Sequence, residues 1–563
     1  MLATLASPGG GAQEPAPPLA VEEAIDVRVV NVDVVVFDKR GRPVTDLGKE
    51  DFVLFEDRQP VAISHFAAPL AGTPGAAEAL EAAGTSASPT GGDATSAPVG
   101  ATVALLLDER TLAPASRRRV VQTVETLEDE PALAGARVVV GRYRDRLEWR
   151  EASSVEEVSG WLEAEEPTAG SVERRIALRR ALSSMEASYD ACEATQLCEP
   201  CHDNWLDMLG YARTFASGEE ARVAEALARL GEALAALSGL PGGAWLLYPA
   251  ESLPHRPGIE AYSYLGEICG SRRSDADREV QQEILLYDES GRLLRLGAWA
   301  NARGVRLFPI DTLGLETPAS ASVDVNRSDL RPSARFDELV RANRQSGLFM
   351  LAEETGGRAV LDSNRPLADL DLGRELAGRY SLGFQPAHPA TGQTHLLKVE
   401  LVKPAGRTLR YRRSYLDRTL EQRLADRLLS ALHFELDDNP LGAAIELGEL
   451  TAGARPGAVR VPLVVGVPAE RLVRLPVPGE TGAEGRGSLR LWLAAQRDDG
   501  VRTVLRQETF AVGPGGLEAK QGIHRLAVEM ELEPGRWTIA LGVRDELTHR
   551  SSVLRRVVDV GAP

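Results

Sequence analysis

The chain has 563 residues, 43% hydrophobic and 26% charged, which is ordinary for a globular protein and long enough for three or four domains. Its formal net charge of −18 excludes a general affinity for nucleic acid, because so acidic a surface repels phosphate backbones. The sequence has no run of 18 or more apolar residues, so it predicts no complete transmembrane helix.

Residues 1–24 are predicted to be disordered or to be the remnant of a signal peptide. Met1–Ser7 is short and apolar, and small residues then lead to Gly11–Glu14. This pattern is typical of the last part of a secretory signal that lacks its basic start and most of its apolar stretch. The alternative is a disordered tail rich in alanine and proline.

Residues 25–66 are predicted to form a small β module. Val30, Val32, Val34 and Val36 recur at every second position, which is the period of a strand. Residues 67–100 consist of Ala, Gly, Ser, Thr and Pro with almost no large side chains. Such a segment cannot bury enough apolar surface to offset its ordering entropy, so we expect a flexible linker.

Residues 101–415 alternate predicted strands and helices, which indicates a doubly wound, mainly parallel sheet. Ala101–Leu107 is a continuous apolar run, as in a strand buried on both faces. Ser217–Glu220 has the pattern of a capping box and predicts the start of a helix with one apolar stripe. Gly356 and Gly357 predict the left-handed end of another helix. Three antiparallel strands are then expected at 380–384, 394–402 and 408–412.

The rest of the chain is predicted to be a helical connector followed by a β-sandwich. The connector spans 416–454 and begins with an amphipathic helix through Leu420, Leu424, Leu428 and Leu432. From residue 455 to residue 563 the pattern changes to short strands separated by turns. These strands are expected at 458–467, 488–495, 502–510, 522–532, 535–544 and 552–560.

Several of these segments together resemble one known family. The strip Val32–Leu47 is followed by characteristic segments at 51–57, 240–248, 300–311, 351–357 and 380–384. In this order they resemble the von Willebrand factor A-related proteins that are abundant in Acidobacteria, over residues 25–415. The resemblance implies a central, Rossmann-type von Willebrand A-like domain in a secreted or periplasmic bacterial protein that binds other macromolecules.

A von Willebrand A domain often holds Mg²⁺ at the C-terminal edge of its sheet, through Asp-x-Ser-x-Ser, a later Thr and a further Asp. The resemblance places Asp108 at the first of these positions and Glu251 at the last, and Thr168 and Ser171 are alternative candidates for the Thr. Arg110 and Leu112 replace the two serines, so a positive charge and a side chain without oxygen stand where the ion needs ligands. We expect a degenerate site in which Asp108 and Glu251 are polar strand ends, with Arg110 as a candidate partner. A divalent cation such as Mg²⁺ at this degenerate site is the alternative.

Four cysteines, Cys192, Cys198, Cys201 and Cys269, are consistent with disulfides in an oxidising compartment. We expect two disulfides that staple a helical insertion at about 172–216 to the segment at Cys269, with three connectivities open. Cys198-x-x-Cys201-His202 also matches the attachment motif of c-type haem, in which both thiols bind the haem and His202 its iron. The same residues with Cys192 offer a zinc ligand set. A redox or electron-transfer module is therefore an alternative.

Signals for catalysis are largely absent from the sequence. It contains no His-Glu-x-x-His, no Gly-x-Ser-x-Gly and no glycine-rich nucleotide-binding loop. Asp311, His255 and His395 stand alone and are predicted to be surface or loop-capping residues. We therefore expect a non-enzymatic, extracytoplasmic protein that binds a protein or a surface polymer and needs no cofactor. A structural component of the cell envelope is a further alternative.

Overall fold

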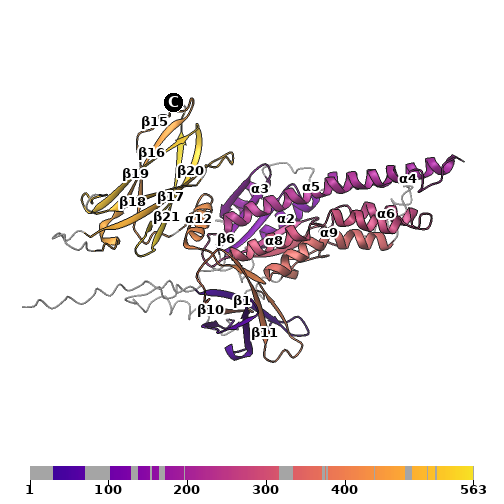
Figure 1. Cartoon of the computed structure of the whole chain (residues 1–563), viewed down its shortest axis with the longest axis horizontal. Coiled ribbons are helices and arrows are strands. Elements are labelled where there is room, and N and C mark those ends of the chain that lie inside the picture. The colour runs from indigo at the N-terminus through magenta and orange to yellow at the C-terminus, as the bar shows by residue number, and fades with distance from the viewer. Residues whose placement is uncertain are drawn as a thin grey trace, which may run out of the picture.

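The computed structural model describes residues 29–69, 102–127, 137–151, 155–163, 172–195, 197–315, 334–370, 375, 378–436, 438–475, 485–503, 505–513 and 516–561. These residues form a mixed α/β protein with one sheet that contains parallel strands and four antiparallel sheets. Figure 1 shows most of the helices gathered around the parallel-containing sheet, with the C-terminal strands on one side. The predictions for 1–24 and for most of 67–100 lie outside the described residues.

The central sheet has the strand order β7-β6-β5-β8-β9. Its strands are β5 (Thr102–Asp108), β6 (Arg137–Tyr143), β7 (Leu147–Glu151), β8 (Ala244–Ala250) and β9 (Val305–Asp311). All are parallel except β7, an antiparallel edge strand, which confirms the predicted mainly parallel sheet. Chain order reverses between β5 and β8, and ligands bind open α/β sheets at the carboxyl ends of strands beside such a switch point.

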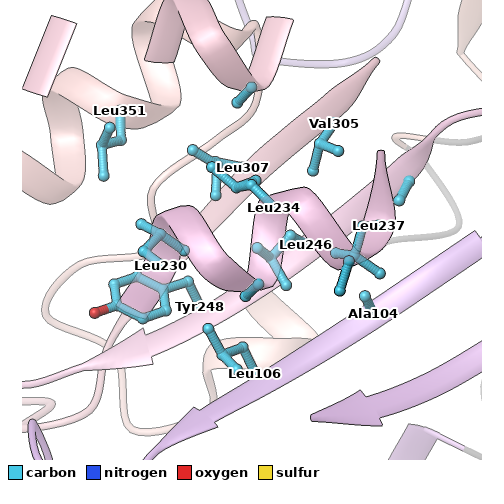
Figure 2. Packing of buried hydrophobic residues seen from close by; sticks show 14 of the residues in the cluster. Ala104, Leu106, Leu230, Leu234, Leu237, Leu246, Tyr248, Val305, Leu307 and Leu351 are labelled. Carbon is cyan, nitrogen blue, oxygen red and sulfur yellow. The ribbon is translucent and has the colours of Figure 1, made fainter. Parts of the chain in front are cut away.

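One face of the sheet is covered by α5 (Trp205–Leu237), α8 (Ser290–Ala302) and α9 (Ala334–Thr355). Figure 2 shows Leu230 and Leu234 of α5 beside Leu246 and Tyr248 of β8. The other face packs against α2 (Pro114–Leu127) and α3 (Val155–Glu163). Because both faces are covered, every residue of β5, β8 and β9 is buried.

The helical insertion is an antiparallel pair of α4 (Val172–Ala194) and the first half of α5, and it extends away from the C-terminal strands (Figure 1). The predicted helix start at Ser217 is wrong, because α5 begins at Trp205 with Asn204 as its N-cap residue. Trp205 and Phe215 are buried in a core with α6 (Ile259–Cys269), so the helix continues through Ser217. Two further helices are α7 (Ala276–Leu286) and α10 (Pro366–Leu370).

Two four-stranded antiparallel sheets combine the N-terminal strands with strands after α10. Their orders are β12-β1-β10-β4 and β13-β11-β2-β3. The N-terminal segment supplies β1 (Val30–Phe37), β2 (Phe52–Glu56), β3 (Gln59–Val61) and β4 (His65–Ala67), with a 3-10 turn at Lys49–Asp51. The later segment supplies β10 (Arg379–Phe384), β11 (Thr394–Leu401), β12 (Thr408–Tyr411) and β13 (Ser414–Leu416).

This pairing differs from the predicted boundaries, which place residues 25–66 in a module of their own and residues 379–415 in the central domain. In the structure Val34 pairs with Tyr380, and Leu54 pairs with Val399. The physical reason is the shared core: the valines of β1 are buried against Leu382 and Phe384, so neither segment buries its apolar face alone. We call these eight strands the split β module.

The C-terminal part begins with α12 (Leu420–Ala431), which confirms the predicted amphipathic helix; its N-cap residue is Thr419. Two four-stranded antiparallel sheets follow and share one hydrophobic core. The first contains β14 (Ala444–Leu447), β15 (Thr451–Ala452), β16 (Val459–Pro468) and β19 (Ile523–Leu532). The second contains β18 (Arg506–Val512), β17 (Gly487–Arg497), β20 (Gly535–Asp545) and β21 (Ser551–Val560), and α12 packs on its outer face. Across the described ranges, no helix is long and apolar enough to cross a membrane.

Candidate functional site

Asp108 is the last residue of β5 and is fully buried. Both of its carboxylate oxygens accept hydrogen bonds from Nε of Arg229 on α5, at 3.1 and 3.0 Å. The amide of Arg110 donates to Oδ1 at 3.1 Å in the turn that ends the strand. Burial raises the pKa of Asp108 above its ordinary value, and the charge and hydrogen bonds of Arg229 act in the opposite direction. This buried carboxylate is therefore paired with an arginine of the same chain.

The residues at this edge do not fit a Mg²⁺ ion. Mg²⁺ requires near-octahedral oxygen ligands, whereas Arg229 covers both oxygens of Asp108. Leu112 is buried and has no oxygen to offer. The donor set at this edge therefore does not suit Mg²⁺, and the degenerate adhesion site that the resemblance implies stays a prediction.

The positive charge beside Asp108 does not come from the residue that the sequence indicates. The side chain of Arg110 turns outward, where Nε donates to the carbonyl of Arg144 and Nη2 donates to Asp145, both at 3.1 Å. It is 55% exposed, so its guanidinium faces solvent. Arg229 takes the place beside Asp108. Burial acts to lower the pKa of Arg229, but the charge and hydrogen bond of Asp108, together with the nearby Tyr248 and Glu225, outweigh burial and raise it.

Glu251 directly follows β8, and the structure brings it to the loop after β5. Its Oε1 accepts a hydrogen bond from the amide of Ala113 at 2.8 Å, and its side chain is buried. Thr168 and Ser171 lie outside the described residues. Two of the residues that the resemblance assigns therefore lie at one edge of the sheet, where an arginine and a backbone amide bind them.

Two further buried carboxylates at this edge are also paired. Nε of Arg117 on α2 donates at 3.1 Å to Glu109, which lies in the loop that leaves β5. Asp311 ends β9, and its Oδ2 accepts from Arg344 at 3.2 Å and from Gln345 at 2.6 Å. Of the predicted surface or loop-capping role, the structure shows the second: Asp311 is only 1% exposed, and its Oδ1 accepts from the amide of Leu313 at 3.0 Å in the loop after β9. Along this edge the chain supplies its own cationic partners for the acidic strand ends.

A crevice of about 190 Å³ lies beside Arg229, between the sheet edge and helices α4 and α5. We call it the switch-point crevice; its charged lining consists of Arg110, Arg174, Arg222, Arg229, Glu173, Glu219 and Glu225. At its base Arg174 donates to Glu219 at 2.5 Å and to Glu260 at 2.7 Å. Burial lowers the pKa of Arg174, but these two carboxylates outweigh it and raise the pKa. At its mouth the side chain of Arg222 is 41% exposed, and its Nε donates to Glu219 at 2.7 Å.

The comparisons with known proteins assign no family to this chain. No family model matches it, and no curated protein matches it. What the crevice can bind therefore follows from its own residues. Planar guanidinium groups donate pairs of hydrogen bonds to carboxylates and to carbonyl oxygens, and arginine is enriched in protein interfaces.

The four cysteines form two disulfides, Cys192–Cys198 and Cys201–Cys269. The first closes the loop after α4, and the second ties the residues before α5 to the end of α6. None of the four is free. Because haem attachment needs two free thiols and a zinc site needs thiolates, this pairing leaves Cys198-x-x-Cys201-His202 without the groups that either alternative requires. The disulfides stiffen the far end of the helical insertion.

A larger cavity of about 460 Å³ lies at the opposite edge of the sheet, next to the split β module. Its charged lining consists of Arg306, Arg379, Arg412, Arg418, Arg423, Asp33 and Asp417. Arg412 donates to the carbonyl of Asn301 at 3.0 Å and to that of Asn31 at 2.5 Å, and burial lowers its pKa to about 10. These bonds join the split β module to α8, which gives the arginines a structural role between the two parts.

The structure also gathers three residues that no local sequence motif links, Glu56, His388 and His395. One ligand atom from each lies within 4.8 Å of the others. The prediction that His395 is a surface or loop-capping residue is wrong, because it is only 9% exposed. Glu56 and His388 lie 332 residues apart, and only the pairing of β2 with β11 brings them together. A hydrophobic pattern identifies a strand but not its partner, so the sequence has no signal for this cluster.

Proposed function

We propose that this chain is a non-enzymatic, extracytoplasmic protein that binds another protein or a surface polymer through the switch-point crevice. It does so with a von Willebrand A-like domain whose metal-dependent adhesion site is degenerate, held between the split β module and a C-terminal β-sandwich. The observation that carries the proposal is the Arg229–Asp108 pair, with both carboxylate oxygens bonded to one guanidinium at the switch point of the sheet.

The position of the crevice supports a binding role. It lies at the carboxyl ends of the parallel strands beside the reversal of strand order, where open α/β sheets bind their ligands. Arg110 and Arg222 stand at its mouth, while Glu225 is 72% exposed beside them. This mixed charge suits a protein partner that presents both carboxylates and cationic groups, because complementary charges fix the orientation of binding.

The disulfides support an extracytoplasmic location. Disulfides form and persist in the periplasm and outside the cell, and they are rare in the cytosol. Here all four cysteines are paired, and the bond between Cys201 and Cys269 closes a sequence separation of 68 residues. A bond across such a long loop stabilises the helical wall of the crevice only in a compartment that keeps it oxidised.

A serine–histidine contact near the crevice does not have the geometry of a catalytic pair. Nδ1 of His255 lies 2.7 Å from Oγ of Ser346. That hydroxyl donates its proton to the carbonyl of Asn343 at 2.6 Å and accepts from the backbone amide of His255 at 3.0 Å. A serine nucleophile must give its proton to the histidine, and here the carbonyl of Asn343 competes with the ring for that single proton. The contact fixes the loop after β8 on α9.

A photo-crosslinking experiment tests the proposal. A benzoylphenylalanine residue replaces Arg110 at the mouth of the crevice, and in a control chain it replaces the exposed Arg536 on β20. Each full chain is irradiated with an envelope extract of the cells that produce it. We expect a discrete crosslinked partner from position 110 that is absent from position 536, and a weaker yield when Arg222→Glu is added. Equal products from both positions, or none from position 110, would contradict binding at the crevice.

A further inference from the structure

The cluster of Glu56, His388 and His395 lies in the split β module, away from the switch-point crevice. Glu56 ends β2 and His395 is the second residue of the neighbouring strand β11. His388 lies in the loop between β10 and β11. The two strands pair directly, with Glu56 opposite Leu397. A ligand atom from each of the three residues lies within 4.8 Å of the others.

His395 is held in the orientation of a metal ligand. Its Nδ1 lies 2.7 Å from Oδ2 of Asp57, whose other oxygen accepts from the amide of Leu396 at 2.8 Å. A carboxylate only accepts, so Nδ1 carries the proton and Nε2 keeps its lone pair. This Nε2 is buried and has no hydrogen-bonding partner among the described residues. A carboxylate that fixes the far nitrogen of a histidine is the usual support of a metal-bound imidazole.

Glu56 places a carboxylate beside the two imidazoles. Its side chain is buried, and its Oε1 accepts from the hydroxyl of Tyr415. Nε2 of His388 lies 3.1 Å from the same oxygen. The ring of His388 stacks on that of His395, with 4.3 Å between the ring centres and 23° between the planes. Oε1 of Glu56 therefore already has a hydroxyl and an imidazole beside it, and a metal ion between these groups would take the place of the His388 contact and use the lone pair of His395.

The far side of His388 is also supported, and its side chain is partly exposed to solvent. Its Nδ1 lies 3.2 Å from the carbonyl of Pro389 and 3.5 Å from Oδ2 of Asp417, so this nitrogen has acceptors beside it and Nε2 faces Glu56. The side chain is 32% exposed. The cluster is therefore reached from solvent through His388, and the same ring can turn to bring its nitrogen closer to the other two ligands.

Two imidazole nitrogens and one carboxylate oxygen select the kind of ion. Imidazole suits zinc, copper, iron and nickel, whereas magnesium and calcium prefer oxygen ligands alone. Three protein ligands of this kind, two histidines and one glutamate, with a water in the fourth position, make a recurrent zinc site. Zinc bonds of about 2.0–2.2 Å in a tetrahedron put neighbouring ligand atoms roughly 3.4 Å apart. The three ligand atoms lie within 4.8 Å of one another, so metal binding would require them to draw closer together, with the partly exposed His388 the least confined.

We propose that Glu56, His388 and His395 bind a divalent transition-metal ion of the zinc class, with Asp57 orienting His395. The ion would join β2, β11 and the loop before β11. The site goes beyond the proposed partner binding, because none of its residues lines the switch-point crevice.

Zinc titration of the full chain, after dialysis against a chelator, tests the site. Calorimetry is expected to show saturable binding of one Zn²⁺ per chain, and Co²⁺ in its place is expected to give the visible absorption of tetrahedral coordination. His388→Ala and His395→Ala are expected to weaken binding at least tenfold, and Asp57→Asn about 10–100-fold as an orienting residue. His65→Ala, an exposed histidine in the same module on β4, is the matched control and should bind as the native chain does.

Two results of these titrations would contradict the proposed metal site. Absence of saturable Zn²⁺ binding, or binding that survives His388→Ala unchanged, contradicts it. His388 is the least buried ligand, so this variant is expected to keep the circular dichroism spectrum of the native chain, and His388→Gln provides a second variant of similar volume. Crosslinking from position 110 is independent of Zn²⁺, so the failure of either proposal is recognised separately.

Discussion

Nε of Arg229 lies 3.1 and 3.0 Å from the two carboxylate oxygens of Asp108, although 121 residues separate them in the chain. The pair sits where the resemblance to von Willebrand A domains places an adhesion metal. A guanidinium supplies positive charge there without leaving coordination positions for a partner's carboxylate. We therefore expect the carboxyl-terminal edge of the central sheet to keep its structure in the absence of divalent ions.

Removal of Arg229 should destabilise the chain strongly. Arg229→Met leaves the buried Asp108 without its cationic partner, and breaking a buried pair from one side costs about 3–5 kcal/mol. The double variant Asp108→Asn/Arg229→Met is expected to recover part of this loss, because it no longer buries an unpaired charge. Arg110→Ala, on the exposed arginine of the same edge, should cost less than about 1 kcal/mol. Urea unfolding followed by circular dichroism measures all three; equal effects of Arg229→Met and Arg110→Ala would contradict the account.

The two disulfides should differ in their contribution to stability. Cys201–Cys269 closes a separation of 68 residues and Cys192–Cys198 one of 6. In the chain-entropy model these loops correspond to about 4 and about 2 kcal/mol. We expect Cys201→Ser/Cys269→Ser to lower the unfolding midpoint more than Cys192→Ser/Cys198→Ser. Mass spectrometry of unreduced peptides checks the pairing, and a peptide linking Cys198 to Cys201 would contradict it.

His433 should make stability depend on pH. Burial and then the charges of Arg502 and Arg555 lower its pKa to about 3, and a guanidinium nitrogen of Arg502 lies 3.2 Å from Nε2, where it can only donate. The pKa of His433 is lower in the folded chain than in the unfolded chain, where it is about 6.5. The contribution of the neutral ring to folding stability is therefore complete above pH 6.5. It is lost as pH falls below 6.5, because the unfolded chain then binds the proton more readily. The loss is at most on the order of 1 kcal/mol per pH unit, since the ring is partly exposed. Urea unfolding at pH 7.5 and 5.5 should show a smaller difference in the free energy of unfolding for His433→Gln than for the native chain. Equal differences for the two chains would contradict this role of His433.

Replacement of Gly356 by alanine should destabilise the chain. It ends α9 with φ of +68°, and an added Cβ would lie 2.3 Å from the backbone carbon of Tyr411 on β12. Gly356→Ala therefore combines a strained conformation with a steric clash and should cost about 2 kcal/mol or more. Gly291→Ala in α8, where only the flexible end of Arg295 is close, is the matched control and should be near neutral. The thermal unfolding midpoints of the two variants compare them; similar midpoints would argue against the close approach of α9 and β12.

The local elements could be predicted from the sequence far better than their partners. Continuous apolar runs predict β5 and β8, because a strand buried on both faces is apolar at every position. Alternation predicts a C-terminal strand such as β16, because a strand buried on one face is apolar at every second position. The pairing of Val34 with Tyr380 could not be predicted, since many strands would fit the same apolar face. The capping pattern at Ser217 is misleading because the apolar face of α5 continues in front of it.

The candidate site could be predicted in part. Strand ends identify Asp108 and Glu251 as residues of one edge, since parallel strands deliver their carboxyl ends to the same side. Arg229 was missed because a charged residue on a helix usually faces solvent. A weak signal existed: Ala226 and Ala233, three residues before and four residues after it, both face the core, so Arg229 borders the buried face.

The most direct test of the central claim is calorimetric titration of the full chain with Mg²⁺ and Ca²⁺, which the histidine cluster of the split β module does not favour. We predict no saturable heat, because Arg229 already covers both oxygens of Asp108. We also predict that crosslinking from position 110 is unchanged by a chelator of these ions. Saturable Mg²⁺ binding that is lost in Asp108→Asn would contradict the account and restore a metal-dependent adhesion site.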